Sequence, residues 1–497
     1  NAVFSLGEGS TVSAPVCDAF NIVFKVGDTV LGDEYVVEDA SQPLTIGYET
    51  PGKKASETIL KIMRTEKLAA TADTAAGTIA VTFGDAFEEG SFAVMLCDTE
   101  ENVLIRVVRL AAKSAKPEYY GIKTAEDLRK FAEAVNSGRS YDRYRDESGD
   151  VVLLGDIDMT GTTEWTPIGT AENPFTGKFD GKGYTIKNIG WTADAAKSTA
   201  HGLFGVLNQA TVRNLTVGAK GDKLTVRGTA GAGTAVAGVA AFATESVIEN
   251  VTNNVSISFE AEDPAGVLVM LAGIAGQMTG TTIGGTSAAA ACVNNGDITT
   301  GPLANTANGG TGMQVGGICA YIKSAENNLI GYCTNNGRVN APSGRGGGLA
   351  GTFEKGTIAI PQNKGLVEDD AAGQYTGQKD QYGNKRMGGL VGGSTTTGCI
   401  IENCTNAGNV ITHLGCRTGG FSGHNLGTIR NCKNTGAVIG NVTTDGSNLH
   451  GPGWACGYNQ SASLIKGCIG NGFVGDYDTY KDAPTTAPAA LHTTDVC

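Results

Sequence analysis

The sequence predicts an all-β protein: an immunoglobulin-like β-sandwich followed by a parallel β-helix with three short strands per coil and a capping helix. Three observations lead to this fold class. Glycine accounts for 73 of 497 residues, roughly double its usual share. A glycine-containing unit recurs along most of the chain. The units are rich in Val, Ile, Thr and Asn and lack a 3.6-residue apolar stripe, so the repeat is built from strands.

Residues 1–112 are predicted to form the sandwich, because short β-branched segments alternate with turn residues. These segments are 20–24, 34–37, 77–82, 91–96 and 103–110. Segment 57–67 fits either a helix or a further strand. Cys17 and Cys97 are the only cysteines of this region and would bridge the two sheets if the protein is exported.

A linker at 113–120 and a capping helix at 121–138 are expected next. Thr124 is a suitable N-cap with Asp127 three residues later, and Gly138 supplies the C-terminal stop. An apolar face is formed by Leu128, Phe131, Ala132 and Val135. Since a stack of strands would otherwise expose its core, we expect the helix to cover the open end of the β-helix.

The β-helix is expected to span 139–475, followed by a tail at 476–497. Its first part contains the motifs LGDIDM (154–159), WTPIG (165–169), FTGKFDGKGYTI (175–186) and GLFG (202–205). These motifs resemble those of the GLUG-motif β-helix proteins, which include adhesin-like lipoproteins of Gram-negative gut anaerobes and the non-catalytic part of some immunoglobulin A proteases. The resemblance implies adhesion or ligand binding at an extracellular or outer-membrane surface, with a lipid anchor upstream of residue 1 as one option.

Eight copies of the unit align on the second glycine of the first strand, at intervals of 31 to 44 residues. The aligned glycines are Gly202, Gly238, Gly273, Gly317, Gly348, Gly389, Gly420 and Gly453. The second strand is predicted to carry a core column of Val212, Ile248, Ile330, Ile358, Ile401, Ile429 and Ile465. The third strand ends each unit with an apolar pair such as Val410 and Ile411.

The recurring cysteines and asparagines are interpreted as structural. Five cysteines share a column with Leu215, Val251 and Pro361, which indicates buried thiols: Cys292, Cys333, Cys404, Cys432 and Cys468. Cys319 and Cys456 fall in a second column with alanines. A turn of the form Asn-x-Gly follows the second strand and predicts a ladder of amides from Asn294, Asn335, Asn363, Asn406 and Asn434.

The composition restricts the partners. A net charge of −13 and no clustered basic segment argue against nucleic acid or an anionic membrane surface. No apolar run reaches the length of a membrane span. The chain begins at Asn1, which suggests that an export signal has been removed. No cofactor is expected, and the sequence leaves the oligomeric state open.

Two groups of charged residues are candidates for chemical sites. The exposed column of the second strand is predicted to be Arg213, Glu249, Ala290, Gly331, Ala359, Glu402, Arg430 and Lys466, which suits ion pairs between coils better than a pair of catalytic carboxylates. Asp156, Asp158 and Asp180 form the strongest group of carboxylates. They would either cap turns, which we favour, or hold calcium.

The long connections after the third strand all leave the same corner and would line one edge of the β-helix. They are 218–235, 260–271, 299–314, 366–386 and 441–451. Tyr375, Tyr382, Phe259 and His450 are candidate ligand-binding residues on this edge, for a glycan or a surface protein. Loops that merely tolerate insertion remain an alternative. The rival functions are a polysaccharide lyase or glycoside hydrolase on a β-helix, and a structural stalk.

Overall fold

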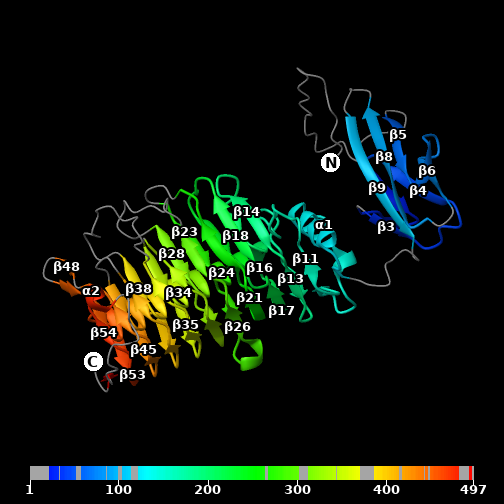
Figure 1. The fold of residues 1–497 in the computed structure, drawn as a ribbon. Coiled ribbons are helices and arrows are strands. Elements are labelled where there is room, and N and C mark those ends of the chain that lie inside the picture. The colour runs from blue at the N-terminus through cyan, green and yellow to red at the C-terminus, as the bar shows by residue number, and fades with distance from the viewer. Residues whose placement is uncertain are drawn as a thin grey trace. The chain divides into compact units, whose positions relative to one another are not determined.

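The computed structural model divides into two compact units, residues 1–120 and 121–497 (Figure 1). It describes residues 22–32, 34–51, 58–84, 87–98, 103–112, 121–262, 267–300, 312–342, 344–369, 385–412, 417–441, 443–445, 448–480 and 492–494.

The N-terminal unit contains two sheets around one core. The first sheet has the order β2 (Thr29–Val30), β1 (Val23–Val26), β4 (Leu44–Glu49), β7 (Thr78–Phe83) and β6 (Leu68–Asp73). The second has the order β3 (Glu34–Val37), β9 (Val103–Ala112), β8 (Glu89–Asp98) and β5 (Thr58–Glu66). Their inward side chains, including Ile46, Ile79 and Phe92, form the core. Segment 57–67, for which the sequence allowed either a helix or a strand, contains strand β5.

Cys97 is a free thiol, which contradicts the disulfide to Cys17. Cys17 lies outside the described residues.

Helix α1 (Ala125–Asn136) begins the C-terminal unit and carries the expected capping box. The Asp127 amide donates to Thr124 Oγ1 at 3.1 Å, and the Thr124 amide donates to Asp127 Oδ2 at 3.0 Å. Phe131 is fully buried and meets the rings of Tyr141 and Phe175 edge to face. The apolar face of α1 therefore packs on the first coils of the β-helix.

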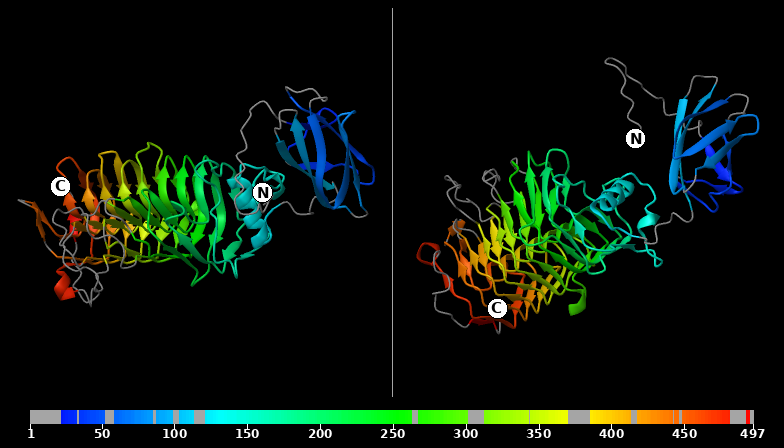
Figure 2. Two further views of the ribbon diagram at one scale, coloured as in Figure 1. Left: turned by 90° about the horizontal axis from the view of Figure 1, so that it is seen from above. Right: turned by 45° about the vertical axis from the view of Figure 1, so that its right-hand side comes forward.

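The coils stack into four sheets of parallel strands, the third of which ends in the antiparallel strand β55 (His492–Thr494) (Figures 1 and 2). In chain order within a coil, the first sheet contains β15 (Ala200–His201), β19 (Thr234–Ala237), β23 (Val269–Ala272), β28 (Met313–Gly316), β33 (Arg345–Gly347), β38 (Arg386–Gly388), β43 (Arg417–Gly419) and β50 (Pro452–Gly453). The second contains β16 (Phe204–Asn208), β20 (Ala240–Thr244), β24 (Ala275–Thr279), β29 (Cys319–Ile322), β34 (Ala350–Phe353), β39 (Val391–Ser394), β44 (Ser422–Asn425) and β51 (Cys456–Asn459).

The third and fourth sheets complete each coil. The third contains β10 (Val151–Val152), β11 (Ile157–Asp158), β12 (Lys178–Asp180), β13 (Thr185–Lys187), β17 (Thr211–Val217), β21 (Val247–Asn253), β25 (Thr282–Ile283), β26 (Cys292–Asn294), β30 (Leu329–Ile330), β31 (Cys333–Asn335), β35 (Gly356–Ala359), β36 (Gln362–Asn363), β40 (Cys399–Glu402), β41 (Thr405–Asn406), β45 (Thr428–Arg430), β46 (Lys433–Asn434), β52 (Leu464–Lys466), β53 (Cys468–Gly470) and β55 (His492–Thr494). The fourth contains β14 (Gly190–Asp194), β18 (Lys223–Arg227), β22 (Ser256–Phe259), β27 (Ile298–Thr300), β32 (Val339–Asn340), β37 (Val367–Glu368), β42 (Val410–Ile411), β47 (Val438–Ile439) and β54 (Val474–Gly475).

Four short elements lie outside these sheets. They are the 3₁₀ turns η3 (Asp142–Tyr144) and η4 (Ala288–Ala290), the hairpin of β48 (Thr443–Asp445) and β49 (Asn448–His450), and the short helix α2 (Tyr477–Tyr480).

The parallel β-helix is confirmed, but a coil has more than three strands. The Gly-Gly pair is a corner between the first and second sheets rather than the middle of one strand. The third sheet takes two short strands from most coils, as in β30 and β31. The core column from Val212 to Ile465 is confirmed by the pairing register, which adds Ile283 to it.

Two positions of the predicted alignment are wrong. Gly453 pairs with Gly419, so Trp454 occupies the position of Gly420 in the last coil. Ala290 lies in η4, and Gly284 pairs with Gly331 in the exposed column, because η4 is an insertion between β25 and β26. A short insertion of small residues cannot be distinguished from strand residues by its composition alone.

The asparagine ladder is confirmed and lies inside the β-helix. The side-chain amide of each asparagine donates to the next one at 2.8 to 2.9 Å, in the order Asn253, Asn294, Asn335, Asn363, Asn406 and Asn434. All six side chains are fully buried. A Cβ on the second glycine of the corner would overlap the adjacent amide, as at Gly348 against Asn363. The two motifs of the repeat therefore require each other: the glycine provides the space that the amide fills.

The last coil exchanges the two residue types. Trp454 stands where earlier coils have glycine, and Gly470 stands where they have asparagine. A Cβ on Gly470 would overlap the Trp454 ring, and Asn434 Nδ2 donates to the Trp454 carbonyl at 3.1 Å. The ladder therefore ends at Trp454.

Candidate functional site

The predicted ligand-binding aromatic residues do not form one described site. Phe259 lies on β22 with its side chain fully buried, so it contributes to the core and cannot stack on a ligand. Alternation along β22 turns this ring inward, which the prediction missed. His450 ends β49, and its side chain is outside the described part of the chain. Tyr375 and Tyr382 also lie outside the described residues.

The long connections do leave one corner, between the fourth and first sheets. Chain segments that pass from β27 to β28, from β37 to β38 and from β47 to β50 all cross this corner. The described strands on either side of these connections therefore end and begin at this corner.

Asp156 and Asp158 act as local hydrogen-bond acceptors. Asp156 accepts from the Thr185 amide at 2.9 Å and from Lys187 Nζ at 3.1 Å. Asp158 accepts from Asn188 Nδ2 at 2.8 Å and from Thr160, and these hydrogen bonds lower the pKa of Asp158 to about 2. These contacts match the turn-capping interpretation.

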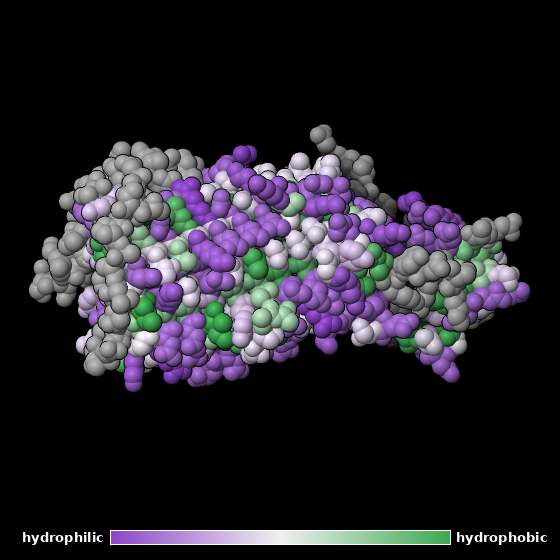
Figure 3. Space-filling model, turned by 60° about the horizontal axis from the view of Figure 1, so that its bottom comes forward, coloured by the Kyte–Doolittle hydropathy of each residue, from purple (hydrophilic) through white to green (hydrophobic). Residues whose placement is uncertain are grey.

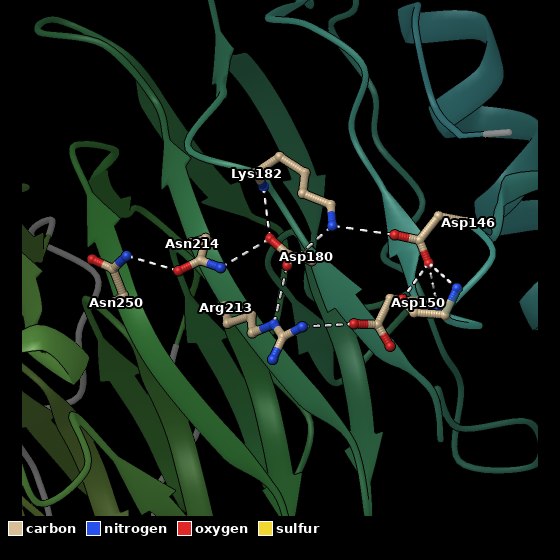
Figure 4. A network of polar contacts seen from close by, with 8 residues as sticks. Asp146, Asp150, Asp180, Lys182, Arg213, Asn214 and Asn250 are labelled. Carbon is tan, nitrogen blue, oxygen red and sulfur yellow. Dashed lines mark hydrogen bonds and ion pairs between the residues drawn. The ribbon is translucent and has the colours of Figure 1, made fainter. Parts of the chain in front are cut away.

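Asp180 belongs to a separate ion-pair network (Figure 4). Arg213 donates from Nε to Asp180 at 3.1 Å and from Nη2 to Asp150 at 2.7 Å. Lys182 bridges Asp180 and Asp146. Burial alone would raise the pKa of Asp180, but hydrogen bonds from Asn214 and Lys182 and the neighbouring cations lower it overall.

This network is suited to binding coils together rather than to proton transfer. Asp150 and Asp180 are both buried, and Arg213 comes from the following coil. A carboxyl group whose pKa is lowered stays ionised and cannot serve as a general acid near neutral pH. Among the described residues, no three His, Cys, Asp or Glu side chains are grouped so that they could hold a metal ion.

The described cysteines are buried or partly buried free thiols. The cysteine column follows the predicted register, with Cys292 beside Cys333 and with Cys404, Cys432 and Cys468 in successive coils. Burial raises the pKa of Cys319 to about 12. Cys399 is buried and donates to the Phe353 carbonyl at 3.1 Å. Because the thiolate is the reactive form, such thiols are poor nucleophiles.

The outer face of the third sheet carries ion pairs between coils, as predicted. Arg430 Nε donates to Glu402 Oε2 at 2.6 Å. In Figure 3, where the lower side of Figure 1 comes forward, hydrophilic side chains alternate with small separate apolar groups. A surface of this kind is an ordinary solvated face.

A different cluster, missed from sequence, lies on the first sheet. Arg345, Arg386 and Arg417 are the first residues of β33, β38 and β43 and pair with one another in register. We call these three residues the arginine column. They are partly buried and point away from the core, which contains the adjacent Met387. A detectable signal was present, since each arginine lies three residues before the second glycine of its unit.

Side chains of the second sheet face the arginine column across the Gly-Gly corner. Arg345 Nη1 donates to Thr352 Oγ1 at 3.1 Å, and Thr352 also bonds Gln314. Arg417 Nη1 lies 3.2 Å from His424 Nδ1, and its guanidinium carbon lies 4.6 Å from the centre of the Tyr458 ring.

The electrostatics of this corner are those of a partly desolvated cationic site. Burial lowers the pKa of Arg345 from its usual value, and the nearby Tyr321 and Glu354 oppose that effect. Burial, reinforced by Arg386 and Arg417, lowers the pKa of His424 to about 3. The His424 ring is therefore neutral near pH 7 beside three positive charges.

Comparison with known protein families identifies the repeat motif in one segment of the chain. Residues 383–411 match the family described as the GLUG motif. The resemblance noted from sequence is thus confirmed over a segment that contains β38 to β42. A solved structure titled "IgA1 Protease" is similar at 14% sequence identity with a TM-score of 0.34, and the match covers 77% of this chain. The chain spans 29% of that protein. No curated protein sequence matches.

Within the described residues, no helix is long and apolar enough to cross a membrane.

Proposed function

We propose that the chain is an extracellular or cell-surface protein that binds a ligand, either a glycan or a protein, in an adhesive role. The observation that carries this proposal is the arginine column facing Tyr321, His424 and Tyr458. Such a set of cationic and aromatic side chains on one side of a rigid scaffold is typical of binding surfaces. The adjacent loop corner supports the same position.

A panel of polysaccharides and surface proteins tests this proposal, scored for both retention and cleavage. We expect retention of at least one member without product release. Release of shortened polysaccharide would contradict a binding-only role and would favour the lyase or hydrolase alternative. A protein that retains no member of the panel would support the stalk alternative instead.

A pair of variants tests whether the retained ligand binds at the Gly-Gly corner beside the arginine column. Tyr458→Ala removes the ring over which Arg417 lies, and we expect weaker retention. Leu464→Ala, an exposed apolar position on the third sheet, serves as the control and should leave retention unchanged. Equal retention by both variants would mean that the ligand binds elsewhere.

A further inference from the structure

We infer that the arginine column binds an anionic polysaccharide that lies along the axis of the β-helix, its carboxylate or sulfate groups pairing with successive coils. This inference rests on the proposed binding function and names the ligand class for the same corner.

The guanidinium groups of the arginine column suit an anionic ligand. Guanidinium groups bind planar or tetrahedral anions through two parallel hydrogen bonds, and they do so most strongly where water is partly excluded. All three arginines are partly buried, and Arg345 forms no ion pair with any carboxylate of the described residues. The chain as a whole carries a charge of −13, so this column is a local exception that a polyanion would select.

The spacing of the three arginines along the β-helix restricts the kind of anion. Arg345, Arg386 and Arg417 come from consecutive coils, and adjacent parallel strands lie about 4.8 Å apart. An extended acidic peptide presents side chains on one face only every two residues, about 6.7 Å apart, which does not match this repeat. A polysaccharide with an anionic group on every ring is not held to this alternation, because rotation about its glycosidic bonds can bring the groups of neighbouring rings to one side.

A buried hydrogen-bond donor, His424, lies beside the arginine column. His424 is 6% exposed, and its Nδ1 faces a guanidinium N–H of Arg417, which assigns the ring proton to Nε2. The Nε2 atom makes no hydrogen bond of ordinary geometry, although Gln460 is close enough to affect the ring. This N–H group lies next to three guanidiniums and adds a further donor for an anionic oxygen.

The column also has a defined beginning. The preceding residues of the same column are Ala235, Met270 and Gln314, and the charges start at Arg345. Ala235 and Met270 belong to a small apolar cluster with Phe242. The anionic part of the ligand is therefore restricted to the coils of β33, β38 and β43.

Equilibrium binding of the full chain to defined polymers tests the inference. Polygalacturonate and alginate supply carboxylates, chondroitin sulfate and heparin supply sulfates, and dextran is the neutral control. We expect binding to at least one charged polysaccharide, binding that weakens as salt is added, and little binding to dextran. The preferred polymer distinguishes carboxylate from sulfate.

Charge-removal variants locate the site. Arg386→Gln should weaken binding roughly tenfold or more, because one charge-assisted contact is lost. Arg430→Gln, on the third sheet, is the matched control and should bind as the unmodified protein does. Thermal melting verifies that each variant is folded at the temperature of the binding measurement.

The outcomes separate the inference from the proposed function. Undiminished binding of charged polysaccharide by the triple variant Arg345→Gln, Arg386→Gln, Arg417→Gln would overturn the inference, as would a preference for polyglutamate, which would indicate an acidic protein. Retention of only a neutral glycan would overturn the inference and leave the proposed function standing. Retention of nothing would overturn both.

Discussion

Single residues in the turns show how closely the repeat constrains side-chain choice. Next to the cysteine column, Asn214, Asn250, Asn403 and Asn431 all adopt the left-handed backbone conformation that asparagine tolerates. Ile360 occupies the same column with φ of 74° and is 44% exposed. A β-branched residue is strained there, so this position stores an unfavourable energy that asparagine would not.

Ile360→Asn should therefore stabilise the protein by about 1 kcal/mol, because it relieves backbone strain and loses little buried apolar area. Chemical denaturation measures the difference. The reciprocal control, Asn403→Ile, should destabilise the protein, because it places a β-branched residue in the left-handed backbone conformation. A lower denaturation midpoint for Ile360→Asn would show that the isoleucine side chain stabilises the fold by more than the strain of its backbone destabilises it.

His424 predicts a pH dependence of stability. Its folded-state pKa of about 3 is below the ordinary 6.5, so the unfolded chain takes up a proton first as pH falls. The stability contribution is complete above about pH 6.5 and is lost progressively toward pH 3. Arg345, Arg386 and Arg417 produce part of this effect, and Tyr458 packs on the ring.

His424→Gln should lose less stability than the unmodified protein between pH 7 and pH 5, by up to about 2 kcal/mol. Denaturant titrations at both pH values measure this. Parallel losses in the two proteins would show that other groups control the acid sensitivity.

At the scale of the element, the coil is defined by a reciprocal pair, the corner glycine and the ladder asparagine. The sequence revealed both as separate motifs, since each repeats at a fixed offset. It did not reveal that they touch, because contact between Gly348 and Asn363 depends on how the coil closes. The predicted first strand is in fact divided between the first and second sheets, and the sequence did not reveal this either, because the division also depends on how the coil closes.

The exchanged pair in the last coil tests this interpretation. Trp454→Gly alone should destabilise the protein by several kcal/mol, because it leaves a cavity beside Phe421. Adding Gly470→Asn should restore part of the loss, since the amide can join the ladder at Asn434. A double-mutant cycle by thermal unfolding measures the coupling. Additive effects would mean that the two positions are independent.

At the scale of the whole molecule, the fold class followed from the sequence because every coil repeats the same pattern of core residues. The candidate site did not follow, because it depends on what differs between coils. Arginine at Arg345, Arg386 and Arg417 replaces the smaller residues of earlier coils. The candidate aromatic residues, such as Phe259, were predicted from their position on the long connections, which does not give the direction of a side chain.

A stack that contacts only its neighbours should open from its ends. Cys333 lies in a middle coil and Cys468 in the last one, and both thiols are buried with raised pKa values. Native-state alkylation followed by mass spectrometry should therefore label Cys468 before Cys333. Simultaneous labelling would show that the β-helix opens as one cooperative unit.

The way the third sheet ends has a consequence for self-association. The last parallel strand of a sheet leaves an unpaired edge on which another chain could pair, and repeated pairing of that kind builds fibrils. Here β55 runs antiparallel to β53 and occupies that edge, while Trp454 blocks the row of amides and α1 covers the opposite end. Strand β55 and Trp454 therefore hinder the pairing of a second chain with the end of the third sheet.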